Sequence, residues 1–181
     1  MLVNVQDSAL LVIDVQGRLL GGIHQSEALV QKCQALITLA QALDVPVLGS
    51  EQYPQGLGHS AEPLVELLGQ DAFVGKTVFS CAESTEFCDR LAKTAKNSVI
   101  LCGMEAQACI IQTAFGFLAQ GKTVYVVADA ISARNPLETE LACQRMRAAG
   151  IHIITAEMLG FEWVRDSSHP QFKLFSKLLL R

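Results

Sequence analysis

The sequence predicts a single α/β domain, with helices on both faces of a mostly parallel β-sheet. Short apolar runs alternate along the chain with longer amphipathic segments, and this alternation is typical of βαβ units. The runs are rich in Val, Ile and Leu and lack polar alternation, as expected of strands that are buried on both faces. A length of 181 residues suits one domain, which we expect to span residues 1–181.

The strands are expected in six apolar runs, which are Ala9–Asp14, Val45–Gly49, Phe73–Val78, Ser98–Cys102, Lys122–Ala128 and Ile151–Thr155. In such folds the working residues gather at the carboxyl ends of the strands. Asp14 ends the first run, Lys76 lies in the third, and Cys109 follows the fourth after a short turn. We therefore expect these three side chains to meet at one edge of the sheet.

The amphipathic segments between the runs predict helices. Ser26 and Ser84 each precede an apolar-periodic segment, and their side chains can cap the N–H groups of a first turn. Pro136, directly after Asn135, suits the first position of a helix, and Gly150 suits its end. The other predicted helices are Ala108–Ala119, Glu157–Val164 and Phe172–Leu180. The last of them packs either on its own domain or against another subunit.

The composition narrows the classes of partner. Half of the residues are hydrophobic and 18% are charged, which favours a packed core over disorder. The formal net charge of −4 gives no general attraction to nucleic acid or to an anionic membrane. The stretch Ala9–Val15 is short and contains Asp14, so it is read as neither a signal peptide nor a membrane span. We expect a cytoplasmic protein whose partners are a small-molecule substrate and copies of itself, as a homodimer or higher homo-oligomer.

The six cysteines form no Cys-x-x-Cys pair and no cluster with zinc-like spacing, so reduced thiols are expected. Five of them are interpreted as structural, and these are Cys33, Cys81, Cys88, Cys102 and Cys143. Cys109 differs because it lies where a strand passes into a helix, whose free N–H groups and dipole favour a thiolate. From its position alone, Cys109 is either a nucleophile or a small buried apolar residue.

Five stretches of the sequence together resemble the isochorismatase-like cysteine hydrolases. Three of them contain Asp14, Lys76 and Cys109, and the second resembles the short isochorismatase domain-containing proteins. The stretches are Leu11–Gln16, Ser50–Gly58, Gly75–Ser80, Cys102–Cys109 and Val126–Arg134. The similarity runs from about Ser8 to the segment His169–Lys173.

The resemblance implies a three-layer αβα sandwich with a mostly parallel six-stranded sheet in the order 3-2-1-4-5-6. It implies a catalytic triad of Asp14, Lys76 and Cys109. It also implies a cis peptide bond between Met104 and Glu105, with the N–H groups of Glu105 and Cys109 as the oxyanion hole. Relatives with nicotinamidase activity bind a metal through an Asp-x-His pair. Here Ser50–Tyr53 replaces that pair, so we expect neither a metal nor another cofactor.

The predicted function is that of a cysteine hydrolase acting on a small amide, carbamoyl or related C–N substrate through a thioester. Isochorismatase itself cleaves a vinyl ether without the cysteine, and a complete triad fits C–N hydrolysis better. Gln16, Tyr53 and Phe79 are expected in the substrate pocket because they lie near the motifs. A catalytically silent scaffold is the main alternative. A redox thiol protein would need a resolving cysteine, and a dinucleotide site would need a glycine-rich turn that the sequence lacks.

Overall fold

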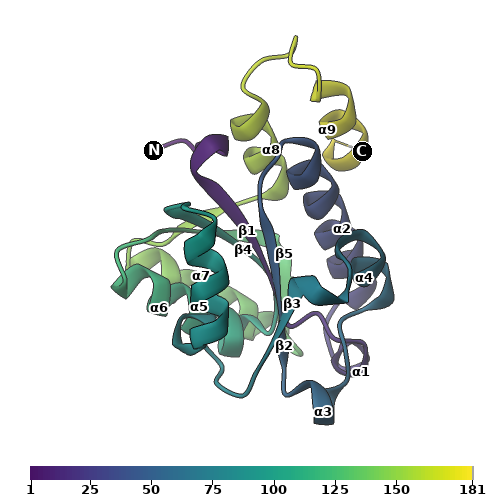
Figure 1. Cartoon of the computed structure of the whole chain (residues 1–181), viewed down its shortest axis with the longest axis vertical. Coiled ribbons are helices and arrows are strands. Elements are labelled where there is room, and N and C mark those ends of the chain that lie inside the picture. Colours follow the sequence, from purple (N-terminus) through teal and green to yellow (C-terminus); the bar gives the residue numbers. More distant parts are fainter. Residues whose placement is uncertain (181) are drawn as a thin grey trace.

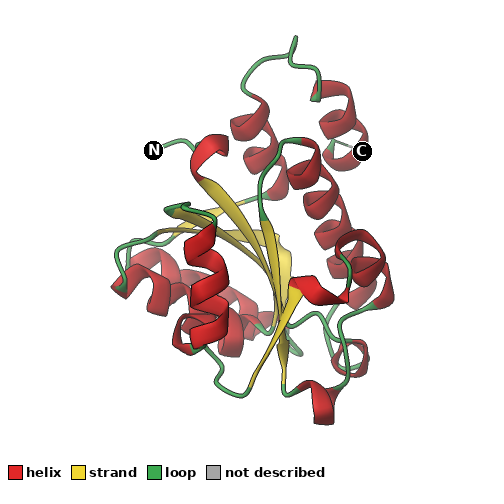
Figure 2. Ribbon diagram, in the orientation of Figure 1, coloured by secondary structure: helices red, strands yellow, loops and turns green. Residues whose placement is uncertain are grey.

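The computed structural model describes residues 1–180, and it consists of one six-stranded sheet between two layers of helices (Figures 1 and 2). All strand pairs are parallel, and the order is β3-β2-β1-β4-β5-β6. The strands are β1 Ser8–Ile13, β2 Val47–Gln52, β3 Phe73–Lys76, β4 Ser98–Met104, β5 Thr123–Ser132 and β6 His152–Ile154. The predicted fold class and strand order are confirmed. Arg181, the last residue of the predicted domain, lies outside the described residues.

The helices divide between the two faces of the sheet, as Figure 1 shows. α5, α6 and α7 cover one face, and α2, α4, α8 and α9 lie on the other. Two short helices, α1 and α3, belong to the loops after β1 and β2. The bounds are α1 Gly17–Leu20, α2 Ser26–Ala42, α3 Pro54–Leu57, α4 Glu62–Leu68, α5 Thr85–Lys93, α6 Ile111–Ala119, α7 Pro136–Ala148, α8 Ala156–Val164 and α9 Phe172–Leu179.

The central strand β1 contributes to the core on both faces of the sheet. Leu10 and Val12 pack into the cluster beneath α2, while Leu11 and Ile13 pack into the cluster beneath α6 and α7. All six residues of β1 are buried. Burial on both faces favours apolar side chains, which explains the unbroken apolar run from Ala9 to Ile13. The buried Ser8 hydroxyl at the start of the strand is satisfied by donating to the Asn4 carbonyl oxygen.

The helix ends follow most of the predicted capping residues. The Ser84 side chain accepts a hydrogen bond from the Phe87 N–H, and the Asn135 side chain accepts one from the Leu137 N–H. The prediction for Ser26 is wrong, because Ser26 is the first residue of α2 and Gln25 is the N-cap, without a side-chain cap. The Gln25 carbonyl oxygen accepts the first hydrogen bond of the helix, from the Leu29 N–H, so α2 begins one residue too early for Ser26 to cap it.

The C-terminal helix α9 packs on its own domain, against α2 and α8. The Phe175 ring lies over Gly160 and meets the Phe161 ring edge-on, with 4.8 Å between the ring centroids. Phe175 and Leu179 are both buried, as parts of the hydrophobic core on this side of the sheet. Within residues 1–180, the helices are all too short or too polar to cross a membrane.

Candidate active site

The parallel register brings the ends of three strands to one place. Ile13, the last residue of β1, is paired with Ser50 of β2 on one side and Gly103 of β4 on the other. Gly103 has a φ of 116°, and a Cβ there would collide with the Ile13 backbone, so β1 and β4 approach each other closely only because this residue is glycine. Asp14, the next residue after β1, therefore lies between β2 and β4.

Asp14 is a buried carboxylate whose oxygens both have partners. The backbone turns at this residue with a φ of 50°, a left-handed conformation that aspartate tolerates better than most residues. Its Oδ1 accepts a hydrogen bond of 2.7 Å from the Ser50 hydroxyl, and its Oδ2 accepts one of 2.8 Å from Lys76 Nζ. The side chains of Asp14 and Lys76 are 2% and 1% exposed, so they form an ion pair almost without solvent.

The Lys76 ammonium, at the end of β3, has three protons to donate and four oxygen acceptors within hydrogen-bonding distance. Besides Asp14, its Nζ lies 2.7 Å from Gln52 Oε1 and within hydrogen-bonding distance of the backbone oxygens of Val78 and Phe79. Burial alone would lower the pKa of the Lys76 ammonium, but the Asp14 carboxylate opposes burial by its charge and its hydrogen bond, and this pKa is raised. Lys76 is therefore a charged, fixed group at neutral pH.

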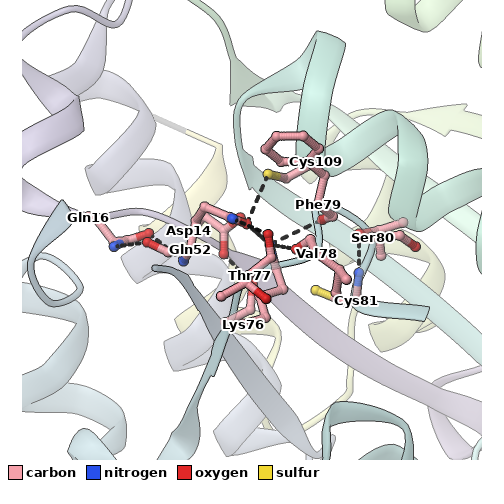
Figure 3. Close-up of polar contacts among 12 residues, drawn as sticks. Asp14, Gln16, Gln52, Lys76, Thr77, Val78, Phe79, Ser80, Cys81 and Cys109 are labelled. Carbon is pink, nitrogen blue, oxygen red and sulfur yellow. Dashed lines mark hydrogen bonds and ion pairs between the residues drawn. The ribbon is translucent and has the colours of Figure 1, made fainter. Parts of the chain in front are cut away.

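Gln52 links Lys76 to Cys109, and no role for it was predicted from the sequence. Its side-chain oxygen accepts from Lys76 Nζ, and the Cys109 Sγ lies 3.9 Å from the same oxygen (Figure 3). Its side-chain nitrogen donates to the backbone oxygen of Thr77 at 2.7 Å. The buried Gln16 side chain holds the Gln52 backbone, accepting from its N–H at 2.7 Å and donating to its carbonyl at 3.0 Å.

Cys109 lies in a π-helical turn, Ala106–Ile110, between β4 and α6. The peptide bond between Met104 and Glu105 is cis, as predicted. The N–H groups of Ala108 and Ile110 both donate to the Glu105 carbonyl oxygen, which fixes the turn around the cysteine. Figure 3 shows the Cys109 sulfur directed toward Asp14 and Gln52. The three residues of the predicted triad thus come together at one end of the sheet.

The thiol of Cys109 differs from the sequence-based expectation in one respect. Burial raises the pKa of the Cys109 thiol, and the Asp14 carboxylate raises it further, both by its charge and as a hydrogen-bond acceptor. Lys76 acts in the opposite direction, but its charge is largely compensated by Asp14 at 2.8 Å. The resting group is therefore a neutral thiol beside a carboxylate, whereas the sequence suggested a thiolate favoured by the N–H groups and dipole of the following helix.

A cavity of about 210 Å³ opens beside the sulfur. Its polar and charged lining residues are Asp14, Gln52, Glu105, Cys109 and Arg134, and its apolar ones are Leu19, Leu57, Phe79, Met104 and Ala108. Phe79 is thus a lining residue, as expected. Gln16 is not, because its buried side chain supports Gln52 instead, and the exposed Tyr53 side chain lies outside this lining.

The position of the metal-binding pair in nicotinamidases is occupied here by a different cluster. Glu51 Oε1 accepts hydrogen bonds from the Ser60 N–H at 2.7 Å and from Gln70 Nε2 at 3.1 Å. Its Oε2 lies 3.0 Å from His59 Nδ1. Within residues 1–180, no three His, Cys, Asp or Glu side chains are grouped to hold one ion. The contact with Glu51 explains the position of His59 without any role for His59 as a metal ligand. That the reaction needs no metal stays a prediction.

We expect Glu51→Gln to lower the free energy of unfolding at neutral pH by ~1–3 kcal/mol. Burial would raise the pKa of the Glu51 carboxyl, but the hydrogen bonds from Ser60, His59 and Gln70 outweigh it, so this pKa is lowered from 4.5. A lowered pKa means that the stabilisation is present above pH 4.5 and is lost as the pH falls through the folded-state pKa. In the Glu51→Gln protein, the free energy of unfolding should therefore fall less steeply as the pH is lowered.

Urea unfolding between acidic and neutral pH measures this effect. Glu66→Gln, at an exposed position of α4, is the matched control and should leave both the stability and its pH dependence nearly unchanged. Equal acid sensitivity in the Glu51→Gln protein and the original protein would contradict the assignment.

The chain is similar over most of its length to known proteins. Residues 8–158 match the family model for the isochorismatase domain. The chain is 38% identical to mouse isochorismatase domain-containing protein 2A, over 96% of this chain and 83% of the relative. A solved structure described as the MAR1 ribonuclease of Caenorhabditis elegans is 37% identical, with a TM-score of 0.91 and coverage of 100% of this chain and 93% of that one.

A more distant solved structure shows the same fold. The YcaC gene product of Escherichia coli, described as an octameric hydrolase of unknown specificity, is 22% identical with a TM-score of 0.92, covering 99% of this chain and 92% of that one. The matched family model covers most of the sequence, including Asp14, Lys76 and Cys109. The chain therefore belongs to the isochorismatase-like hydrolase family.

Proposed function

We propose that this protein hydrolyses a small amide, carbamoyl or related C–N substrate, with Cys109 as the nucleophile. The observation that supports this most is the arrangement around one sulfur: a neutral thiol, a buried carboxylate and a fixed ammonium, all beside a cavity large enough for a small molecule. A carboxylate next to a thiol is suited to take its proton during attack. A surface thiol or a purely structural one would need none of these neighbours.

In the proposed first step, the Cys109 sulfur forms a bond to the substrate carbonyl carbon as its proton passes to Asp14. The carbonyl π electrons move to the oxygen, and the N–H groups of Glu105 and Cys109 are the predicted donors to that oxyanion. When the oxyanion collapses, the C–N bond breaks and Asp14 returns the proton to the departing nitrogen. The products of this half-reaction are an amine or ammonia and a thioester on Cys109.

In the second half-reaction, water takes the place of the amine. Asp14 accepts one proton from the water, whose oxygen forms a bond to the thioester carbon. Collapse of this second oxyanion breaks the C–S bond, and the sulfur recovers its proton from Asp14, so that the enzyme is unchanged. Lys76 keeps its proton throughout and holds the Asp14 carboxylate in place through the 2.8 Å ion pair. The side-chain oxygen of Gln52 contacts both Lys76 Nζ and the Cys109 sulfur, and so holds these two groups in position relative to each other.

The test is a screen of small amides, ureas and carbamates, in which released ammonia or amine is measured, with Cys109→Ala as the control. Hydrolysis that requires Cys109 supports the proposal. Turnover that persists at the same rate in the Cys109→Ala protein would overturn the assignment of the nucleophile. Absence of turnover on every class, with no acyl adduct on Cys109 by mass spectrometry, would favour the alternative of a catalytically silent scaffold.

Ribonuclease activity is a second candidate, because the similar C. elegans protein is described as a ribonuclease. The net charge of −4 argues against it, since nucleic-acid binding depends mainly on neutralising phosphates with basic residues. We expect no cleavage of single- or double-stranded RNA at low salt, measured by gel electrophoresis of labelled RNA. RNA cleavage that disappears in the Cys109→Ala protein would reverse this preference.

The remaining expectations about partners and place are part of this proposal. The E. coli structure of the same fold is octameric, and the exposed side chains of Leu137 and Leu141 on α7 give an apolar surface suited to self-association. A homodimer or higher homo-oligomer therefore stays a prediction. A cytoplasmic location and the absence of a cofactor also stay predictions.

A further inference from the structure

The charged side chains that line the cavity, which are Asp14, Glu105 and Arg134, all belong to ion pairs. At its inner end, the Asp14 carboxylate is paired with Lys76 at 2.8 Å. At its mouth, the Glu105 carboxylate is paired with Arg134, with both oxygens of the carboxylate 3.3 Å from guanidinium nitrogens. Glu105 is held from the other side by the Gln107 side chain, which donates to it at 3.0 Å. Each cation near the sulfur thus already has a carboxylate partner.

The walls between the two pairs are apolar. Leu19, Leu57, Phe79, Met104 and Ala108 line the cavity. An ionised group placed against such walls would lose its hydration, and neither pair offers an uncompensated charge in return. An alkyl chain would instead remove apolar surface from water. The volume of about 210 Å³ limits that chain to a few carbon atoms.

We propose that the Glu105–Arg134 pair makes the cavity selective for a short, uncharged aliphatic acyl group, so that the substrates are simple aliphatic carboxamides. The pair balances its own charge at the mouth, and the apolar walls then favour neutral chains over carboxylates and ammonium groups. As a statement about substrates, this inference rests on the amide hydrolysis proposed above. As a statement about the cavity, it is independent of turnover, because it concerns any reagent that reaches Cys109.

The cavity is tested directly with two alkylating reagents of similar size, neutral iodoacetamide and anionic iodoacetate, at mildly alkaline pH. Mass spectrometry gives the rate of labelling at Cys109, and the ratio of the two rates is divided by the same ratio for glutathione. We expect iodoacetamide to be favoured by about tenfold beyond the glutathione value. A ratio equal to that of glutathione would overturn the inference.

Two charge-neutralising variants identify the pair as the cause. Glu105→Gln leaves Arg134 uncompensated and should raise the relative rate of iodoacetate by roughly threefold to fivefold. Arg134→Gln leaves Glu105 uncompensated and should lower it by a similar factor. Glu86→Gln, in an exposed ion pair with Arg90 on α5, removes the same charge elsewhere and should not move the ratio. If Glu105→Gln and Arg134→Gln left the ratio unchanged, as Glu86→Gln should, the inference would also be overturned.

Hydrolysis then tests the substrate class with two matched pairs of amides. Succinamate is compared with 4-methylpentanamide, and 4-aminobutanamide is compared with pentanamide, so that the two members of a pair are similar in size and differ in the charge and polarity of the end group. We expect kcat/KM to be about tenfold higher for the neutral member of each pair. Faster hydrolysis of a charged member would refute the substrate class and leave the proposed hydrolase function intact. Charge selectivity in alkylation without hydrolysis of any amide would count against the hydrolase function and support the charge-selective cavity.

Discussion

Replacement of Cys109 by alanine is expected to lower kcat/KM for amide hydrolysis by at least about 10³-fold. Without the sulfur, Asp14 has no thiol to deprotonate and no thioester can form, so only binding and oxyanion stabilisation remain. The fold should persist, because the change removes one buried sulfur atom and lowers the free energy of unfolding by ~1 kcal/mol. Ammonia release under single-turnover conditions measures the chemical step directly.

Cys143→Ala is the matched control for this change, since Cys143 is a half-buried thiol on α7 outside the cavity beside Cys109. It should keep the original rate. Added hydroxylamine gives a second measurement, because it attacks a thioester and converts part of the acid product into a hydroxamate. Loss of activity in both alanine variants, or hydroxamate formation by Cys109→Ala, would be incompatible with a thioester on Cys109.

The sequence predicted that the three central residues meet because Asp14 ends one buried apolar run, Lys76 lies in another, and Cys109 follows a third after a short turn. In a parallel sheet those ends share one edge, so Asp14, Lys76 and Cys109 were expected together before any contact was known. Gln52 was missed for a related reason. The second strand was predicted to end at Gly49 but continues to Gln52, which therefore also lies at a strand end. A prediction that extended the second strand to Gln52 would have identified this residue as part of the site.

Other features of the site depend on side-chain directions that periodicity does not encode. Arg134 reaches the cavity mouth from the segment after β5, and Gln16 turns inward to the Gln52 backbone although its neighbours suggest a pocket residue. The thiolate expectation failed because it considered the helix N-terminus and left out the burial of the sulfur and the Asp14 charge, which both raise the pKa of the Cys109 thiol. Only the 2.8 Å distance between Lys76 and Asp14 reveals that the two charges compensate each other.

Breaking the Asp14–Lys76 pair from either side is expected to lower the free energy of unfolding by ~3–5 kcal/mol. Asp14→Asn leaves the Lys76 ammonium buried without its counter-charge, and Lys76→Met leaves the Asp14 carboxylate buried in the same way. In the Lys76→Met protein, the pKa of the Cys109 thiol should also rise, because Lys76 is the charge that lowers it. Urea unfolding measures the first effect, and the pH dependence of Cys109 alkylation measures the second.

The double variant Asp14→Asn/Lys76→Met separates the structural role of the pair from its chemical role. The double variant buries no net charge at this site. In the original protein the Ser50 hydroxyl donates to Asp14 at 2.7 Å, and the side-chain oxygen of the asparagine can accept the same hydrogen bond. We therefore expect the double variant to unfold less readily than either single variant, with a coupling energy of at least ~2 kcal/mol. Its activity should not recover, because the amide cannot take the proton of Cys109. Additive losses of stability would mean that the two charges do not stabilise each other. Recovery of hydrolysis together with stability would mean that Asp14 supports the fold and is not the proton acceptor.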